Sequence, residues 1–433
     1  MGYNGSEQFA KNQRFGFFPA FSAGWVASNE AFLRDNKVLT HLKLRASYGK
    51  VGNDKLGNER FLYLTNISTG SGFVSSLGRG QAINMGKLGN ENLTWEVAYK
   101  QNYGVDLKLF NDFSFSFDYF KEKREDILIV RGTVPELQGV AIGNLPKVNM
   151  GVVNNQGFEI ETGYQKRLDS GLFFSIKGNF AYNKNEQRNM DEAILSKDYA
   201  YRYRKTGYSI GQQFGYLIDY SNGNGYINTA EELEEAKRMY KIGTPRLGDF
   251  KYQDVNGDGE INEKDQAPIK YTDVPRITYG LTGAVEWKGV DFSFHFSGIG
   301  KASRLYNSWG ATELGNEGIY TDVHMHAWTP ERYANGEKIE YPALASIANT
   351  NHIANDYFIM DRSFLRLKNI ELGYTLPKSL LQKVGLSKVR VYINGNNLIT
   401  WKKIKTNTID PEQSWEVNYP LTKMVNFGVN VVF

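Results

Sequence analysis

The residues best suited to chemistry lie together in one short acidic segment, residues 254–265, which reads DVNGDGEINEKD. Oxygen-bearing side chains occupy its positions 1, 3 and 5, a glycine occupies position 6, and an acid closes it at position 12. With a backbone carbonyl at position 7, this is the spacing of the calcium loop of an EF-hand. The predicted calcium ligands are Asp254, Asn256, Asp258, Glu260 and Asp265.

Two features separate this segment from a complete EF-hand. Position 12 is Asp265 rather than Glu, which weakens the bidentate closure that Glu provides. The flanking sequence also predicts no clear helix on either side. We therefore expect an isolated loop that calcium stabilises, and the alternative is a glycine-rich acidic turn without metal.

Other titratable pairs have plainer interpretations. His324 and His326 could bind a metal from one strand face, but no third ligand is evident and a structural role is favoured. Glu159 and Glu161 are expected on the same strand face, and neighbouring carboxylates are common on a face that contacts water. No Ser/His/Asp set and no phosphate-cradling glycine loop stands out, so we predict no enzymatic activity.

Aromatic residues in one long connection offer a possible binding surface. Trp309, Trp328 and Tyr333 could stack on sugar rings or pack against a lid. They could equally form the core of a loop or anchor it at an interface. The sequence assigns no substrate to them.

Composition excludes several functional classes. Aromatic residues make up 14% of the 433 residues and glycine contributes 44, yet the mean hydropathy is −0.47. The net charge of +4 is too small for a phosphate-backbone binder, so we predict no nucleic-acid partner. No window approaches the roughly 18 to 20 apolar residues of a membrane helix. The absence of cysteine excludes disulfides, thiolate nucleophiles and Cys-ligated zinc.

Alternation with a period of two runs along most of the chain. From Trp95 to Leu109 the odd positions are mainly apolar and the even positions mainly polar, which predicts one long amphipathic strand. The same pattern recurs after residues 112, 157, 171, 276, 290 and 424. Plausible helices are confined to residues 230–240 and 377–384. The predicted fold class is therefore all-β, with a β-bulge near Lys368.

The connections alternate in length and so orient the predicted sheet. Short joins at 110–112, 167–171, 288–290 and 377–387 alternate with long ones at 51–93, 132–154, 184–276, 300–356 and 401–421. Antiparallel strands then have all short turns at one end and all long loops at the other, as in outer-membrane barrels. We expect roughly 11 to 13 strands, because residues 184–276 hold either no spanning strand or a pair. Residues 254–265 fall in a long, extracellular loop in both cases.

Alternation alone does not separate a membrane barrel from a soluble β-sandwich. Long strands, aromatic residues near strand ends and a densely polar second face favour an antiparallel transmembrane β-barrel. Two rival interpretations remain, a secreted β-rich glycan-binding module and a β-sandwich hydrolase.

Seven ordered stretches carry a family resemblance. The chain resembles the C-terminal part of SusC/RagA-type TonB-linked outer-membrane proteins (TonB-dependent receptors) in RFGFFPAFSAGW (14–25), LTHLKLRASYGKVGN (39–53), GDFKYQDVNGDGEINEKDQ (248–266), PRITYGLTGAVEWKGVDFSFHFSG (275–298), SFLRLKNIELGYTLPKSLL (363–381), VRVYINGNNLITW (389–401) and YPLTKMVNFGVNVVF (419–433).

The resemblance implies a location and a transport role. It implies that residues 1–433 are part of a plugged barrel of roughly 22 strands in the outer membrane of a Gram-negative bacterium. Such a barrel imports glycan fragments or peptides, with a SusD-like surface lipoprotein as lid and TonB as the energy source. The plug domain, the TonB-contacting segment and the signal peptide have no counterpart in the sequence, so we expect a C-terminal barrel portion.

Overall fold

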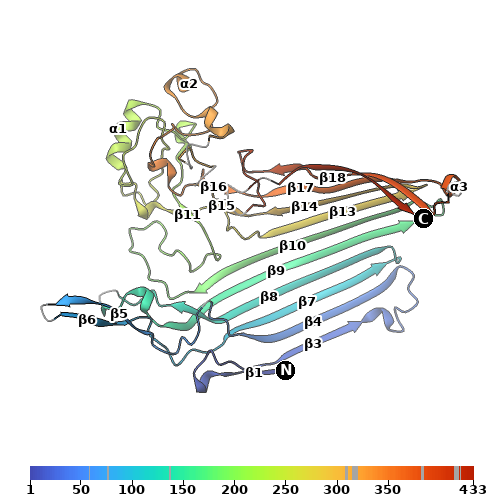
Figure 1. Ribbon diagram of the computed structural model, residues 1–433, viewed down its shortest axis with the longest axis horizontal. Coiled ribbons are helices and arrows are strands. Elements are labelled where there is room, and N and C mark those ends of the chain that lie inside the picture. Colours follow the sequence, from blue (N-terminus) through green and yellow to red (C-terminus); the bar gives the residue numbers. More distant parts are fainter. Residues whose placement is uncertain are drawn as a thin grey trace.

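The protein is built on one long antiparallel sheet of 11 strands (Figure 1). The computed structural model describes residues 1–57, 59–75, 78–135, 138–307, 311–314, 320–381, 385–413, 419 and 421–433. In spatial order the strands are β3 (Ala20–Val26), β4 (Leu39–Asn53), β7 (Glu96–Leu109), β8 (Phe113–Val130), β9 (Lys147–Arg167), β10 (Phe173–Asn189), β13 (Ile277–Trp287), β14 (Val290–Gly300), β17 (Phe364–Thr375), β18 (Lys388–Lys402) and β19 (Met424–Val432).

Tight turns close the sheet at one end. Phe110 and Asn111 join β7 to β8 with positive φ at both residues, and Lys288 and Gly289 join β13 to β14 in the same way. Two consecutive residues with positive φ match the right-handed twist of the flanking strands. Short joins therefore gather at the end near α3 and the long connections at the other (Figure 1), which confirms the predicted alternation.

The register settles two further predictions. Strand β10 pairs directly with β13, so the described residues between 190 and 276 add no strand to the 11-stranded sheet. The predicted bulge is confirmed by a register shift between Leu367 and Asn369. The predicted long connection at 132–154 is too long, because residues 127–130 pair with residues 147–151 and extend β8 and β9 beyond the expected limits.

The two faces of the sheet differ in chemistry. We call the face with the charged and amide side chains the polar face and the other the apolar face. On the apolar face Val425, Phe427 and Val429 are 53%, 80% and 61% exposed. Among the described residues, the hydrophobic clusters lie in the cap and beside the N-terminal hairpin. Since the apolar row is bare rather than packed inside a protein core, a β-sandwich is not supported and an outward-facing barrel wall is.

A compact cap covers the end of the sheet with the long connections (Figure 1). It is formed by the described residues of 190–276, 301–363 and 403–413, and many of their aromatic and aliphatic side chains share one buried cluster. Its elements are β11 (Phe214–Gly215), β12 (Ala267–Pro268), β15 (Ser303–Leu305), β16 (Ile359–Asp361), α1 (Ala230–Met239) and α2 (Pro330–Ala334).

Both predicted helices are present. Helix α1 begins at a capping box in which Thr229 accepts from the Glu232 N–H and the Glu232 carboxylate accepts from the Thr229 N–H. Helix α3 spans Lys378–Leu381 in the turn after β17, so it begins one residue after the predicted start at Pro377, and residues 382–384 of that prediction lie outside the described residues. No helix in the described part of the chain combines the length and the apolar character needed to cross a membrane.

Smaller elements complete the described chain. The hairpin of β5 (Ile67–Ser75) and β6 (Gly78–Met85) projects from the sheet at the same end as the cap (Figure 1). A second hairpin, β1 (Gly2–Gly5) with β2 (Phe15–Phe18), packs near Trp95. Short 3-10 turns are η1 (Lys11–Gln13), η2 (Ala27–Asn29), η4 (Ile142–Asn144), η5 (Tyr220–Asn222), η6 (Glu263–Asp265), η7 (Asp322–His326) and η8 (Thr350–His352).

Candidate functional site

The predicted calcium loop is a compact turn of the cap. The Gly257 and Gly259 N–H groups donate to the two carboxylate oxygens of Asp254 at 2.7 and 2.8 Å. The Glu260 N–H donates to Asp258 at 2.9 Å, and the Asp258 N–H donates to Asn256 at 3.1 Å. Four of the five predicted ligand side chains, those of Asp254, Asn256, Asp258 and Asp265, therefore point into the loop.

The remaining geometry leaves calcium binding untested. Glu260 extends away from the loop to Lys241, at 3.5 Å. Asp265 is buried and accepts from the N–H groups of Val255 and Asn262 at 2.9 and 2.8 Å, while its burial raises the pKa of its carboxyl. Among the described residues, no group of three or more Asp, Glu or His is arranged to hold a metal ion. The calcium site stays a prediction.

The two histidines of the predicted pair, His324 and His326, lie in different environments of the cap. His324 is buried and its Nδ1 accepts from the Thr321 N–H at 2.8 Å, whereas His326 is exposed. Within the same core, Glu313 accepts from Tyr341 at 2.5 Å and lies 3.1 Å from Nε2 of His352. Burial alone would raise the pKa of Glu313, but these hydrogen bonds outweigh it and lower the pKa to about 2. Burial lowers the pKa of His324.

The aromatic residues of the long connection are divided between core and surface. Trp328 is 5% exposed, and its indole N–H donates to Asn228 at 3.0 Å, so it belongs to the core of the cap. Tyr333 is partly exposed on α2. Trp309 lies outside the described residues. The prediction of a loop core therefore holds for Trp328.

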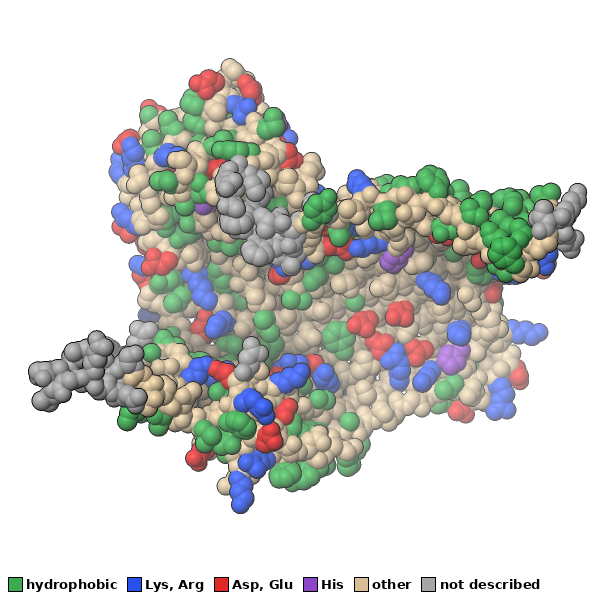
Figure 2. Space-filling model, in the orientation of Figure 1, with side chains coloured by type: hydrophobic (Ala, Val, Ile, Leu, Met, Phe, Trp, Pro, Cys, Tyr) green, Lys and Arg blue, Asp and Glu red, His purple; other side chains and the backbone are tan. Residues whose placement is uncertain are grey.

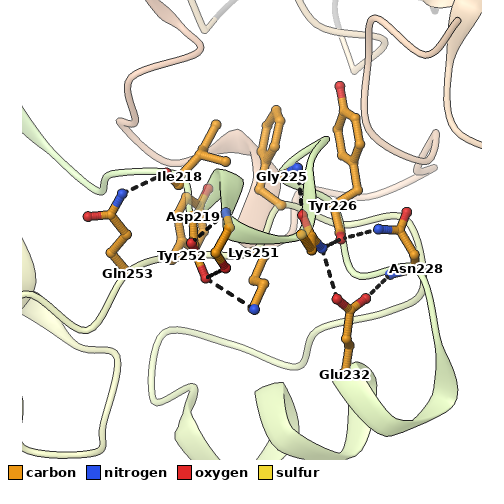
Figure 3. A network of polar contacts seen from close by, with 12 residues as sticks. Ile218, Asp219, Gly225, Tyr226, Asn228, Glu232, Lys251, Tyr252 and Gln253 are labelled. Atoms are coloured by element: carbon orange, nitrogen blue, oxygen red, sulfur yellow. Dashed lines mark hydrogen bonds and ion pairs between the residues drawn. The ribbon is translucent and has the colours of Figure 1, made fainter.

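A polar network fastens α1 to the rest of the cap (Figure 3). The Glu232 carboxylate accepts from the Asn222 side chain at 2.9 Å and from the Asn228 N–H at 2.6 Å. Lys251 pairs with Asp219 at 3.1 Å across the same region. These contacts stabilise the cap internally. We therefore take the polar face of the sheet as the candidate functional surface.

One arginine ties three strands together on the polar face. Arg45 of β4 binds Asp106 of β7 at 2.9 Å and Asp118 of β8 at 2.5 Å, and Ser116 donates to Asp106 at 2.6 Å. The guanidinium lies over Gly104, where a Cβ atom would stand 2.5 Å from its Cζ. Charge-assisted bonds of this forked kind are both strong and directional.

A second arginine repeats the arrangement at the other side of the sheet. Arg390 of β18 binds Asp291 of β14, and its Nη2 lies 2.6 Å from Glu371 of β17. It lies over Gly373, again a residue without a side chain. The polar wall is thus cross-linked by ion pairs perpendicular to its strands.

Four other charges on the polar face form no ion pair with the residues that the structure describes. A cavity of about 740 Å³ opens toward the end with the short turns, and Lys43, Lys108, Lys177 and Glu161 line it. None of these four forms an ion pair with a described residue. His295 lies on the same face, 2.9 Å from Thr282, as its position in the alternation predicts. Figure 2 shows charged side chains spread over this hollowed face and hydrophobic ones along the ridge near the C-terminus.

Comparisons with known proteins agree with this geometry. Residues 2–398 match the family model described as TonB dependent receptor-like, beta-barrel. The chain belongs to this family. TonB-dependent receptor P3 of Formosa agariphila is 29% identical over 443 residues, which cover 99% of this chain and 41% of that protein. TonB-dependent receptor SusC of Bacteroides thetaiotaomicron is 25% identical over 450 residues, 100% of this chain and 42% of SusC.

A solved structure shows the same fold. The RagAB peptide importer in its closed-closed state matches with a TM-score of 0.71 and 21% identity, over 100% of this chain and 45% of that one. The chain thus spans less than half the length of these relatives. The predicted resemblance to SusC/RagA-type receptors is confirmed, and the protein is an outer-membrane β-barrel protein of the Gram-negative type.

Sequence reasoning did not single out Arg45 and Arg390. Both occupy polar positions of alternating strands, which the periodicity shows. Their acidic partners stand on other strands, however, and the pairing depends on a register that the alternation does not fix. The available signal was the pair of glycines, Gly104 and Gly373, at polar-face positions where most neighbours carry side chains.

Proposed function

We propose that the chain forms part of the wall of a TonB-dependent importer that takes nutrients across the outer membrane. Its 11 strands would supply half of a barrel of roughly 22 strands. The chain would contribute no catalysis to this process. Its polar face would border the aqueous passage, and its apolar face would contact lipid.

The observation that carries the proposal is the contrast between the two faces. One face holds cross-strand ion pairs and unpaired lysines, and the other exposes Phe427 and Val429 in a continuous apolar row. Exposed apolar area of this extent is costly in water and stable against hydrocarbon. Family membership adds the transport context.

Cargo and partners are a finer part of the proposal. The relatives SusC and RagAB, the second of which is a peptide importer, support glycan fragments or peptides as cargo. We propose a SusD-like surface lipoprotein as lid and TonB as the energy source. Calcium in loop 254–265, which would rigidify the cap, rests on ligand spacing alone.

Single-cysteine labelling tests the passage directly, because the chain has no cysteine of its own. Asn179→Cys on the polar face should react in intact cells with a small charged thiol reagent. Leu281→Cys, at the matching height on the apolar face, should not. Equal reactivity at the two positions would contradict an aqueous passage along the polar face.

Import itself is tested by deleting the gene. Uptake of labelled oligosaccharide and peptide mixtures should fall for at least one class, and dissipating the proton-motive force should abolish the same uptake in the parent strain. If deletion leaves uptake of both mixtures unchanged, the import proposal is wrong.

A further inference from the structure

A cavity of about 510 Å³ lies on the polar face just beneath the cap. Its floor comes from the parts of β8, β9 and β10 nearest the long connections, and its roof from Met190, Ile210 and Val274. The cavity therefore lies between the sheet and residues of the long connections. The inference below rests on the proposed import function and concerns the class of cargo.

Uncharged amide side chains dominate the floor. Asn155 of β9 stands directly opposite Asn185 of β10, and Asn183 precedes Asn185 by two residues on the same strand. The side chains of Asn155 and Asn183 are half-buried and form no hydrogen bond with the described residues. Asn185 uses its oxygen to accept from the Ile210 N–H at 2.8 Å, which leaves its NH₂ group for another partner.

The ionised groups of the cavity pair with one another and with Lys100 beside it. Arg124 binds Glu122 at 2.8 Å and Glu96 at 3.2 Å, and Lys100 lies 3.5 Å from Glu122. The lining itself holds Glu96, Glu122 and Arg124, and Lys100 lies outside it. With Lys100 included, the paired groups carry no net charge, so the cavity favours neither a strongly anionic nor a strongly cationic cargo. The cavity offers neutral hydrogen-bonding groups and, at one side, a compact group of paired charges.

The apolar part of the cavity is aliphatic. Ile127 and Met190 line it, and Ile210 and Val274 are more than half exposed above it. Among the described residues, no lining side chain is aromatic. Sugar rings are commonly held against aromatic faces, whereas aliphatic side chains of a peptide pack well against an aliphatic roof.

The spacing of the amides fits an extended backbone. Residues two apart on one strand face are separated by roughly 6.5 to 7 Å, which is the repeat of Asn183 and Asn185. Along one edge of an extended peptide, backbone N–H and C=O groups recur with this same repeat. The Asn155 and Asn183 amides can each donate to a peptide C=O and accept from a peptide N–H, and the Asn185 NH₂ group can donate to a peptide C=O.

We propose that this cavity, floored by Asn155, Asn183 and Asn185, binds the backbone of an extended peptide and places its aliphatic side chains beneath Ile210 and Val274. The site would read the backbone and tolerate many sequences. Oligosaccharides lack both the amide repeat and the aliphatic substituents that the cavity matches.

Binding of peptides to the purified, full-length protein tests this assignment. The probe is a synthetic nonapeptide library of Ala, Ser, Val and Lys, with maltoheptaose as the sugar comparison. The double variant Asn155→Ala with Asn183→Ala should bind the library about tenfold or more weakly, because two neutral hydrogen bonds are lost. The matched control, Gln156→Ala with Lys184→Ala, changes neighbouring residues that face away from the cavity and should bind like the wild type.

A photoreactive version of the library gives a second readout on the unmodified protein. Cross-links are expected within residues 122–127, 153–155 and 183–190 and at 210. The assignment is overturned if the wild type fails to bind the library, if both double variants bind it equally, if the cross-links fall elsewhere, or if maltoheptaose binds and only the Asn variant loses it.

Uptake by cells separates this inference from the import proposal. If the wild-type gene restores uptake of the peptide library to a deletion strain and the Asn variant restores it equally well, import stands and the cavity assignment fails. If the wild-type gene restores uptake of neither peptides nor oligosaccharides, the import proposal fails.

Discussion

Placing one lysine on each face of the same pair of strands gives a direct measure of which face meets hydrocarbon. Leu281 of β13 lies on the apolar face and is 38% exposed. Asn179 of β10 lies on the polar face, and its Cα partner in β13 is Gly280, the neighbour of Leu281. The two sites therefore stand at nearly the same height in the sheet.

The height of Leu281 follows from its distance to the turn. It lies six residues before Trp287, an apolar-face residue at the end of β13. With about 3.3 Å of rise per residue and a strand tilt of about 40°, Leu281 stands roughly 15 Å above that ring. If Trp287 marks the lipid boundary of an apolar band about 25 Å tall, Leu281 lies within a few ångströms of the midplane.

The two substitutions should differ strongly in cost. Leu281→Lys should destabilise the folded protein by about 2 to 4 kcal/mol, the cost of a lysine at the midplane of a barrel wall. This corresponds to roughly 30-fold to 700-fold in the unfolding equilibrium. Asn179→Lys should change the free energy by less than about 1 kcal/mol, because it adds a charge opposite Glu161 in water.

The assay is reversible unfolding of the full-length protein in lipid vesicles by guanidinium chloride, at the same lipid-to-protein ratio for all variants. Leu281→Gln serves as the control for loss of the leucine without a gain of charge. Equal shifts of the unfolding midpoint for Leu281→Lys and Asn179→Lys would refute the assignment of the faces. A shift no larger for Leu281→Lys than for the Gln control would refute contact with hydrocarbon at this position.

Three further predictions follow from the polar face and the cap. Gly104→Ala should displace the Arg45 guanidinium and cost about 1 to 3 kcal/mol, measured in the same vesicle titration, while a midpoint equal to the wild type would contradict the cross-strand role. The cap should lose stability as the pH falls below about 6.5, because unfolding lets the buried, neutral His324 take up a proton, whereas the stability that Glu313 contributes is lost only between about pH 4.5 and 2. Urea unfolding followed by tryptophan fluorescence at pH 7.5, 6.5 and 5.5 should show the loss of stability that His324 causes. The variant His324→Asn should show a smaller loss over the same pH range. Calorimetric titration of loop 254–265 in the folded protein should release heat with calcium above an EDTA-treated blank, and no such heat would count against the metal site.

Strand positions and faces could be predicted because they are local properties of the sequence. From Trp95 to Leu109 apolar and polar side chains mainly alternate, and a strand places them on opposite faces by geometry alone. The bulge at Lys368 was visible for the same reason, since the parity of the apolar residues changes there. The extension of β9 back to Lys147 was missed, because residues 147–157 pair with β8 without clean alternation.

The cap could not be predicted in the same way. Its core joins residues about 100 positions apart, as when Trp328 donates to Asn228 and Asn351 donates to Asp249. Such contacts leave no period in the sequence. The acidic loop was recognisable because Asx turns depend on residues only a few positions apart, yet the same spacing serves a turn and a calcium site.

Charged and neutral side chains have different roles on the polar face. Arg45 and Arg390 are saturated by carboxylates on neighbouring strands, so a passing molecule would have to break strong, oriented bonds to engage them. Such groups stiffen a wall and bind cargo weakly. The side chains of Asn155 and Asn183 form no hydrogen bond with the described residues, and they line the cavity beneath the cap. If the proposed import function is right, these amides are therefore available to a cargo at the capped end without the loss of an internal ion pair.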